Sequence, residues 1–266
     1  MRLAVISNVH GNVEALRSVL RDIRRDGIRK VVCLGDLVGH HAFPVETLAL
    51  LRAGGTACVA GNHDLMAIGR LTGDGWIPRT RRAIGWTRRA MTGDDYEYLA
   101  GLPAALRLGE DLLLMHAGLD DPSRELRTPA QFLEERQTIR HRFPEVRVCF
   151  TGHLREQQVV EVTTNGEVLM RGPRQFVLRP ASFFFVSPGS VGLPADGDYR
   201  AAYALYDGAT RRVTFRRTTY DRLRVMQENL RHGLSSELGI SPVDYFRARA
   251  VAAARSIRSR FVGMAS

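Results

Sequence analysis

Six polar residues of types that bind metal ions lie at the ends of apolar, strand-like segments of the sequence. They are His10, Asp36, Asn62, His63, His116 and His153. In open α/β sheets, ligand-binding residues collect outside the carboxyl ends of the strands. Imidazole nitrogens with carboxylate and amide oxygens form a mixed donor set that suits Mn, Fe, Co, Ni or Zn. The six residues therefore predict a site for one or two divalent transition-metal ions per chain.

This donor set fits the hydrolysis of phosphate esters. The reaction needs a nucleophilic hydroxide at neutral pH and positive charge beside the phosphate oxygens, and metal ions supply both. Taken singly, His10, His116 and His153 could be core histidines with satisfied hydrogen bonds. Their joint placement with Asp36 and Asn62 at strand ends favours metal ligands over that interpretation.

The composition indicates one globular domain with small additions at most. The chain has 266 residues and 44% hydrophobic content, which is enough for a full core. No apolar run approaches the ~18 residues that span a bilayer, so we expect no membrane partner. The first apolar run turns polar at Ser7, too early for a secretory signal, so we expect a cytoplasmic protein. The three cysteines lie in separate strand-like runs and are expected to be buried free thiols.

The chain is basic, with a formal net charge of +10. Nearly all of the positive charge is arginine, because Lys30 is the only lysine. Acidic residues are interleaved with the arginines and no block of like charge occurs, which does not favour a nucleic-acid partner. Net positive charge does help to steer a small phosphorylated substrate.

The periodicity of apolar residues predicts an α/β fold. The first strands alternate with helices, which implies a parallel sheet. We expect strands over 2–7, 30–35 and 56–60, helices over 12–26 and 44–54, a broken helical segment over 62–101, a hairpin over 104–115, a helix over 129–142 and a strand over 146–151. After His153, hairpin turns at Asn165-Gly166 and Asp207-Gly208 indicate antiparallel strands. A two-sheet β-sandwich flanked by helices accommodates both halves.

The C-terminal residues predict a helical extension. A helix is expected over 221–231, and Ser241-Pro242 caps another that carries both apolar residues and arginines. We therefore divide the chain into a domain of residues 1–220 and an extension of residues 221–266. The extension is expected to pack on the domain or on a second subunit, and in the second case the protein would be a homo-oligomer. A membrane surface or a nucleic acid is a weaker alternative for this basic helix.

Five short motifs, in order, resemble those of the calcineurin-like metallophosphoesterases, most closely their compact bacterial branch. The family pattern is Asp-x-His, Gly-Asp, Gly-Asn-His-Asp, a lone His and Gly-His-x-His. This chain has Asn8-Val9-His10, Gly35-Asp36, Gly61-Asn62-His63-Asp64, His116 and Gly152-His153-Leu154-Arg155. The resemblance extends to about residue 220 and includes the turn at residues 187–192. It implies the layered α/β/β/α fold of that family.

The resemblance also implies a role for each matching residue. Asp36 would bridge two metal ions, and the second ion would be completed by Asn62, His116 and His153. His63 would contact the phosphate and assist the leaving group, with Asp64 orienting it.

Two departures from the family pattern fall in the half-site of the first metal ion. Asn8 replaces an aspartate and Arg155 replaces the last histidine, while His10 and Asp36 remain. The loss of one negative charge and the gain of one positive charge together equal the charge of a divalent ion. Arginine cannot ligate a metal, so our hypothesis is that Arg155 stands in for the first ion and binds a phosphate bidentately. Alternatively, Arg155 points into solvent, or Asn8 still donates its carbonyl oxygen to a metal.

His40 and His41 occupy positions where the family usually has Tyr-Gly. His40 is a candidate substrate contact, and a plain loop pair is the alternative. The resulting hypothesis is a metal-dependent phosphoesterase, mononuclear or weakly active, that acts on a small phosphomonoester or phosphodiester such as a nucleotide. The alternative is a pseudophosphoesterase that serves as a scaffold or a phosphate-ligand sensor. A phosphodiesterase directed to nucleic acid by the basic C-terminal helix is a weaker third interpretation.

Overall fold

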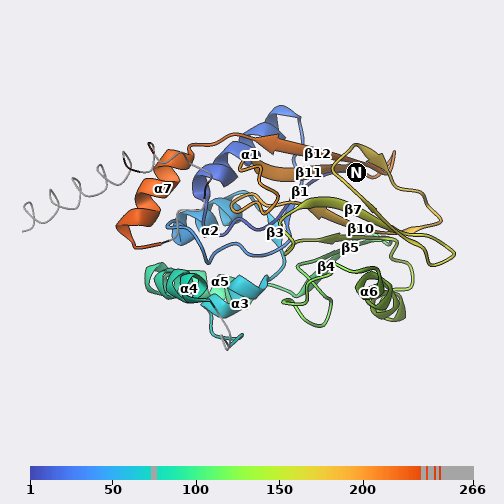
Figure 1. The fold of residues 1–266 in the computed structure, drawn as a ribbon, viewed down its shortest axis with the longest axis horizontal. Coiled ribbons are helices and arrows are strands. Elements are labelled where there is room, and N and C mark those ends of the chain that lie inside the picture. Colours follow the sequence, from blue (N-terminus) through green and yellow to red (C-terminus); the bar gives the residue numbers. More distant parts are fainter. Residues whose placement is uncertain (73–76, 235–237, 239–242, 244–245, 247–266) are drawn as a thin grey trace, which may run out of the picture.

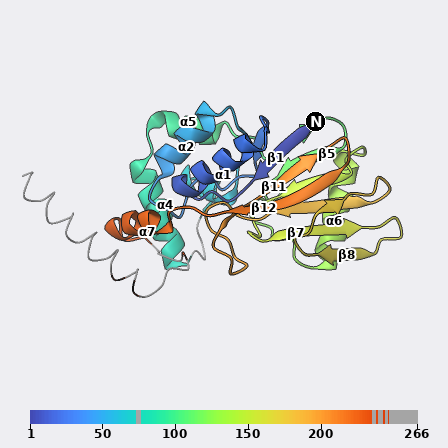
Figure 2. The same ribbon diagram turned by 90° about the horizontal axis from the view of Figure 1, so that it is seen from above.

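The fold consists of two mixed six-stranded sheets stacked on each other, with helices on both outer sides (Figures 1 and 2). The computed structural model describes residues 1–72, 77–234, 238, 243 and 246. The predicted α/β sandwich flanked by helices is confirmed. Its layers follow the order helix, sheet, sheet, helix.

The first sheet combines the N-terminal strands with strands from the second half of the chain. Its order is β3 (Ala57–Cys58), β2 (Val31–Cys33), β1 (Arg2–Ile6), β11 (Ala201–Asp207), β12 (Arg212–Thr218) and β9 (Phe176–Val177). β1, β2 and β3 are parallel, whereas β11 pairs with β1 antiparallel. Helices α1 (Val13–Arg25) and α2 (Pro44–Ala53) connect the parallel strands and cover the outer face.

The second sheet is built in the same mixed way. Its order is β4 (Ala105–Leu108), β5 (Leu112–Met115), β6 (Val148–Thr151), β10 (Phe183–Pro188), β7 (Gln157–Val162) and β8 (Val168–Arg171). β5, β6 and β10 are parallel. Helix α6 (Pro129–Arg142) packs on the outer face through Phe132 and Ile139.

The central strands are buried on both faces because each sheet lies between a sheet and a helix layer. In β1, Leu3 and Val5 face the second sheet, while Ala4 and Ile6 face the helices. Successive side chains of a strand point to opposite faces, so such a strand must be apolar throughout. The rigid core thus holds the strand ends in fixed relative positions.

The predicted helical segment over 62–101 forms three helices within its described part. They are α3 (Asn62–Ala67), α4 (Pro78–Ala90) and α5 (Gly93–Ala100). α3 begins at Asn62 itself, so the residue predicted as a metal ligand is the first residue of a helix.

Helix α7 (Arg222–Arg231) packs against α1 and the loop after β2. Its buried Asn229 accepts a hydrogen bond from the backbone N–H of Ala42 (3.0 Å) and donates one to Nδ1 of His41 (2.9 Å). Nε2 of His41 donates to the carbonyl of Gly192 (3.0 Å). These bonds join α7 to two loops of the domain. The helix predicted from residue 242 onward lies outside the described residues apart from Val243 and Phe246. Among the described helices, none has the length and apolar character needed to cross a bilayer.

His41 makes the stability of the fold depend on pH. Burial lowers the pKa of His41 to about 4, against about 6.5 for the unfolded chain. The imidazole is neutral in both states above pH 6.5, and on acidification the unfolded chain takes up the proton first. We therefore expect the free energy of unfolding to fall by about 2 kcal/mol between pH 7 and pH 5 through this group alone.

Chemical denaturation of the metal-free wild type and of a His41→Gln variant at both pH values measures this contribution. Glutamine can donate to Gly192 and accept from Asn229 without titrating. The wild type should lose about 2 kcal/mol more than the variant on going to pH 5. Equal losses would show that His41 does not titrate on unfolding.

Candidate metal centre and phosphate site

The carboxyl ends of strands from both sheets meet at one edge of the sandwich. β1, β2 and β3 of the first sheet, and β5 and β6 of the second, lead into the loops that carry the predicted ligands. The structure brings five predicted metal ligands together here: His10, Asp36, Asn62, His116 and His153. Asn8, the further candidate ligand, lies on the loop after β1, where its backbone N–H donates to the carbonyl of Gly35 (3.0 Å) and its side-chain amide donates to Oγ of Ser7 (3.0 Å). The predicted phosphate residue His63 lies beside them, and its backbone N–H donates to Oδ1 of Asp36 (2.9 Å).

Three electron-pair donors surround Nε2 of His116, which is itself a fourth. Its Nε2 lies 3.4 Å from Oδ2 of Asp36, 3.1 Å from Oδ1 of Asn62 and 3.2 Å from Nδ1 of His153. Its Nδ1 lies 2.6 Å from the carbonyl of Leu34 and donates to it, so Nε2 of the neutral ring presents a lone pair to the other donors. Facing lone pairs repel unless a proton or a metal cation lies among them. The residues present therefore fit a divalent metal ion.

The titration of these groups in the metal-free protein agrees with this geometry. Burial disfavours a charged Asp36, but the charges of His116, His63 and His10 hold its pKa well below the usual range. Burial likewise opposes charging of His116, but the Asp36 carboxylate raises the pKa of this imidazole. Burial and the charge of His116 lower the pKa of His153 to about 4. Without a metal, a proton on His116 neutralises the charge that a cation would neutralise.

The backbone around the site is strained. Five of the six described non-glycine residues with positive φ belong to it, and they are Asn8, His10, Asp36, His153 and Arg155, with φ between 53° and 63°. The left-handed conformation is costly for residues with a Cβ, and such residues cluster at functional sites. Asn, Asp and His tolerate it better than most residues, whereas Arg155 has no such preference.

Two glycines allow the loops to approach each other closely. A Cβ on Gly61 would overlap Oδ1 of Asp36, and a Cβ on Gly152 would overlap Oγ of Ser7. Each glycine directly precedes a predicted ligand, Asn62 or His153. Glycine before Asn62 and before His153 therefore lets the loops that carry these ligands pack against each other.

Asp64 makes its hydrogen bonds with the backbone. The buried carboxylate accepts from the N–H groups of Leu37 (2.8 Å), Val38 (3.2 Å) and Gly61 (2.9 Å). No hydrogen bond joins it to the His63 imidazole in the part of the chain that the structure describes. Asp64 thus holds the loops after β2 and β3 together, and any orienting effect on His63 is transmitted through those loops.

The second half of the site is a group of three imidazoles. The rings of His10, His40 and His63 lie 4.6–4.8 Å apart between centroids, and one ring nitrogen from each lies within 4.8 Å of the others. Both ring nitrogens of His10 and Oδ1 of Asn8 are buried and have no hydrogen-bond partner among the described residues. Such atoms are costly unless a ligand or ion satisfies them. This half can therefore contact a polar ligand or a second cation.

Arg155 lies within electrostatic reach of the three imidazoles. Burial is the main cause of the lowered pKa values of His10, His40 and His63, and the positive charge of Arg155 adds to each. Its carbonyl accepts a hydrogen bond from the N–H of Ala195 (3.2 Å), which anchors the backbone of this residue.

The two histidines after Gly39 have different surroundings. His40 joins the imidazole group, whereas His41 faces Asn229 and Gly192. One neighbour of the site carries no signal in the sequence. Oε1 of Glu125, on the loop between β5 and α6, lies 3.7 Å from Nε2 of His153. Nothing in a single acidic loop residue could have identified this contact.

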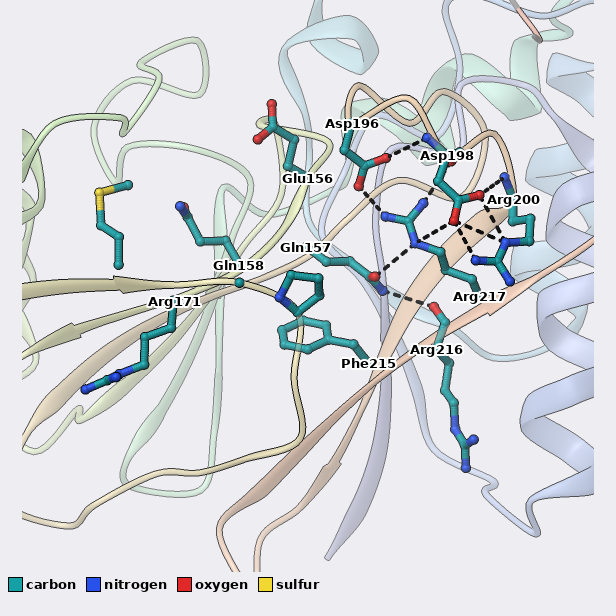
Figure 3. Close-up of a pocket in the computed structure, with 13 residues that line it drawn as sticks. Glu156, Gln157, Gln158, Arg171, Asp196, Asp198, Arg200, Phe215, Arg216 and Arg217 are labelled. Carbon is teal, nitrogen blue, oxygen red and sulfur yellow. Dashed lines mark hydrogen bonds and ion pairs between the residues drawn. The ribbon is translucent and has the colours of Figure 1, made fainter.

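A separate cavity of about 860 Å³ lies between β7, β8 and β12 (Figure 3). It contains none of the predicted site residues. Two of its three acidic residues, Asp196 and Asp198, form ion pairs with Arg217 and Arg200, and the third is Glu156. Among the described residues, no histidine or cysteine lines this cavity, so metal-dependent chemistry is better placed at the strand ends.

Known proteins resemble this chain in sequence and in fold. Residues 1–160 match the sequence model of the calcineurin-like phosphoesterase family. The crystal structure of a metallophosphoesterase from Sphaerobacter thermophilus is 30% identical and gives a TM-score of 0.75, covering 90% of this chain and 96% of that one. The uncharacterized protein MJ0912 of Methanocaldococcus jannaschii is 29% identical over 248 residues, covering 89% of this chain and 95% of its own.

The hypothetical protein PH1004 from Pyrococcus horikoshii OT3 gives a TM-score of 0.69 at 19% identity, covering 89% of this chain and 95% of that one, and shows the shared fold alone. The resemblance inferred from the five motifs is confirmed. With the family model matching more than half of its residues, the chain belongs to the calcineurin-like phosphoesterases.

Proposed function

We propose that the protein is a metal-dependent phosphoesterase that hydrolyses a small phosphomonoester or phosphodiester, such as a nucleotide. One divalent ion would be held by Asp36, Asn62, His116 and His153. The observation that carries the proposal is the convergence of lone pairs from these four residues at an edge of the sandwich. When bound, a divalent ion supplies Lewis acidity and activates a nucleophile.

The remaining residues of the site bind the phosphate and move a proton. Arg155 pairs with phosphate oxygens and supplies the charge of the first metal ion of the family. His10 and His40 have ring nitrogens that can donate to other oxygens of the substrate. His63 gives its proton to the leaving oxygen. Burial lowers the pKa of this imidazole, and a phosphate bound beside it favours the protonated form that an acid requires.

The departures at Asn8 and Arg155 favour a second candidate. A protein that keeps the fold and the phosphate-binding half without turnover would be a phosphate-ligand sensor or a scaffold. The two candidates differ in one respect that can be measured, which is turnover with metal present.

The first test separates the acid from the metal ligand. With Mn added, we expect His63→Ala to lower kcat on nitrophenyl phosphate or its diester about 100-fold or more while the ion stays bound. His153→Ala should lose both activity and the ion, because it removes a donor from the metal site. Steady-state kinetics and elemental analysis measure the two effects.

The exposed His141→Ala on α6 is the matched control and should retain both properties. A folded wild-type protein without turnover on either ester, with each of Mn, Fe, Co, Ni and Zn, would favour the sensor.

The second test counts metal ions. Wild-type protein should bind one ion per chain, because Arg155 occupies the first half-site with positive charge. The double variant Asn8→Asp/Arg155→His restores the family ligands and should bind two. Elemental analysis after dialysis against excess Mn measures both numbers. Two tightly held ions in the wild type would contradict the mononuclear site.

A further inference from the structure

Three arginines line a small cavity on the outer side of the second sheet. Arg136 and Arg140 lie one turn apart on α6, and Arg147 lies just before β6. Thr163 and Thr164, which follow β7, complete the polar lining. The cavity is about 230 Å³, below the ~300–1,000 Å³ of pockets for drug-sized ligands. Its size suits a small ion.

No acidic side chain lines this cavity. In the described part of the chain, Arg136 and Arg140 form no ion pair, and Arg147 donates to the carbonyls of Pro144 (2.6 Å) and Val146 (2.9 Å). Arginines elsewhere differ, since Arg179 binds the Glu161 carboxylate through two nitrogens (3.0 and 2.8 Å). The three guanidinium groups therefore carry positive charge that no neighbouring carboxylate balances.

Arg136 shows the cost of this arrangement. Its Nε atom is buried and has no hydrogen-bond partner among the described residues. Burial lowers the pKa of its guanidinium, and the charges of Arg140 and Arg147 lower it further. Like charges four residues apart destabilise a helix, and an unsatisfied buried N–H group costs additional free energy. Groups that cost the fold stability in this way are typical of binding sites.

We propose that Arg136, Arg140 and Arg147 form a binding site for a free phosphate-class oxyanion, separate from the catalytic centre. Guanidinium groups match the oxygens of phosphate in geometry and charge. Oγ of Thr163 accepts from the N–H of Glu167 (3.1 Å), which leaves its hydroxyl proton for the anion. The site does not depend on the proposed hydrolysis.

The cavity also has a structural connection to the catalytic loops. Glu135 precedes Arg136 on α6, and its carboxylate accepts from the N–H of Leu119 (2.7 Å) in the loop after His116. An anion bound by Arg136 and Arg140 would therefore contact the same helix that holds the loop after His116.

Thermal unfolding of the full-length, metal-free protein with inorganic phosphate tests the site. At constant ionic strength, phosphate should raise the wild-type Tm in a saturable manner by about 3 °C. In the background of Arg155→Gln, which removes the guanidinium from the proposed catalytic phosphate site, the double variant Arg136→Gln/Arg147→Gln should lose this rise. A cooperative thermal transition and an unchanged far-UV circular dichroism spectrum without phosphate show that the variant is folded.

Two further variants locate the effect. Arg29→Gln removes the same kind of charge from an exposed loop position and should keep the full rise. Arg155→Gln removes the guanidinium from the proposed catalytic phosphate site, so the rise that remains in this variant is the part that the cavity produces. A rise in the Arg155→Gln background that survives the addition of Arg136→Gln/Arg147→Gln, or the absence of any rise in Arg155→Gln, would overturn the proposal. Replacing phosphate with a phosphomonoester of similar charge shows whether the cavity admits a substituted anion, and an equal rise would contradict a site for the free ion.

Discussion

The buried carboxylate of Asp36 is the constraint on which the rest of the site depends. Its Oδ1 accepts from the backbone of His63, and its Oδ2 faces His10 at 3.6 Å and His116 at 3.4 Å. A carboxylate without water is tolerated only when cations or hydrogen-bond donors surround it. These partners come from both sheets, so the sandwich must bring the two sets of strand ends to one edge. The candidate metal centre therefore requires the arrangement that the fold provides, in which strand ends of both sheets meet at one edge.

The fold tolerates the strained loops because the layers that carry them are rigid. The left-handed residues at the strand ends each cost free energy, and glycines at positions 61 and 152 give no packing of their own. Strands buried on both faces hold these loops on either side. The hydrogen bonds of Asp64 then join the loop after β2 to the loop after β3. Core packing stabilises a ligand geometry that the loops alone would not adopt.

The two halves of the site differ in the charge that they need. Asp36, Asn62, His116 and His153 present lone pairs that a metal cation would satisfy. The half with Arg155 already carries positive charge, and its imidazoles are held neutral mainly by burial. A phosphate group bridging the halves would meet a cation on one side and a guanidinium on the other.

The sequence by itself determined the layered fold, the order of the elements and the predicted ligand set. Those properties follow from local apolar periodicity and from short motifs at strand ends. Both are patterns of residues close together in the sequence, so they can be identified without the tertiary structure. Only the tertiary structure decided that β10 and β11 enter the middle of the two sheets, and that His40 joins the site while its neighbour His41 faces Asn229. It also decided that Asp64 binds backbone and that three arginines surround one cavity. These contacts join residues far apart in the chain, and no local pattern specifies which face of a loop or helix meets which partner.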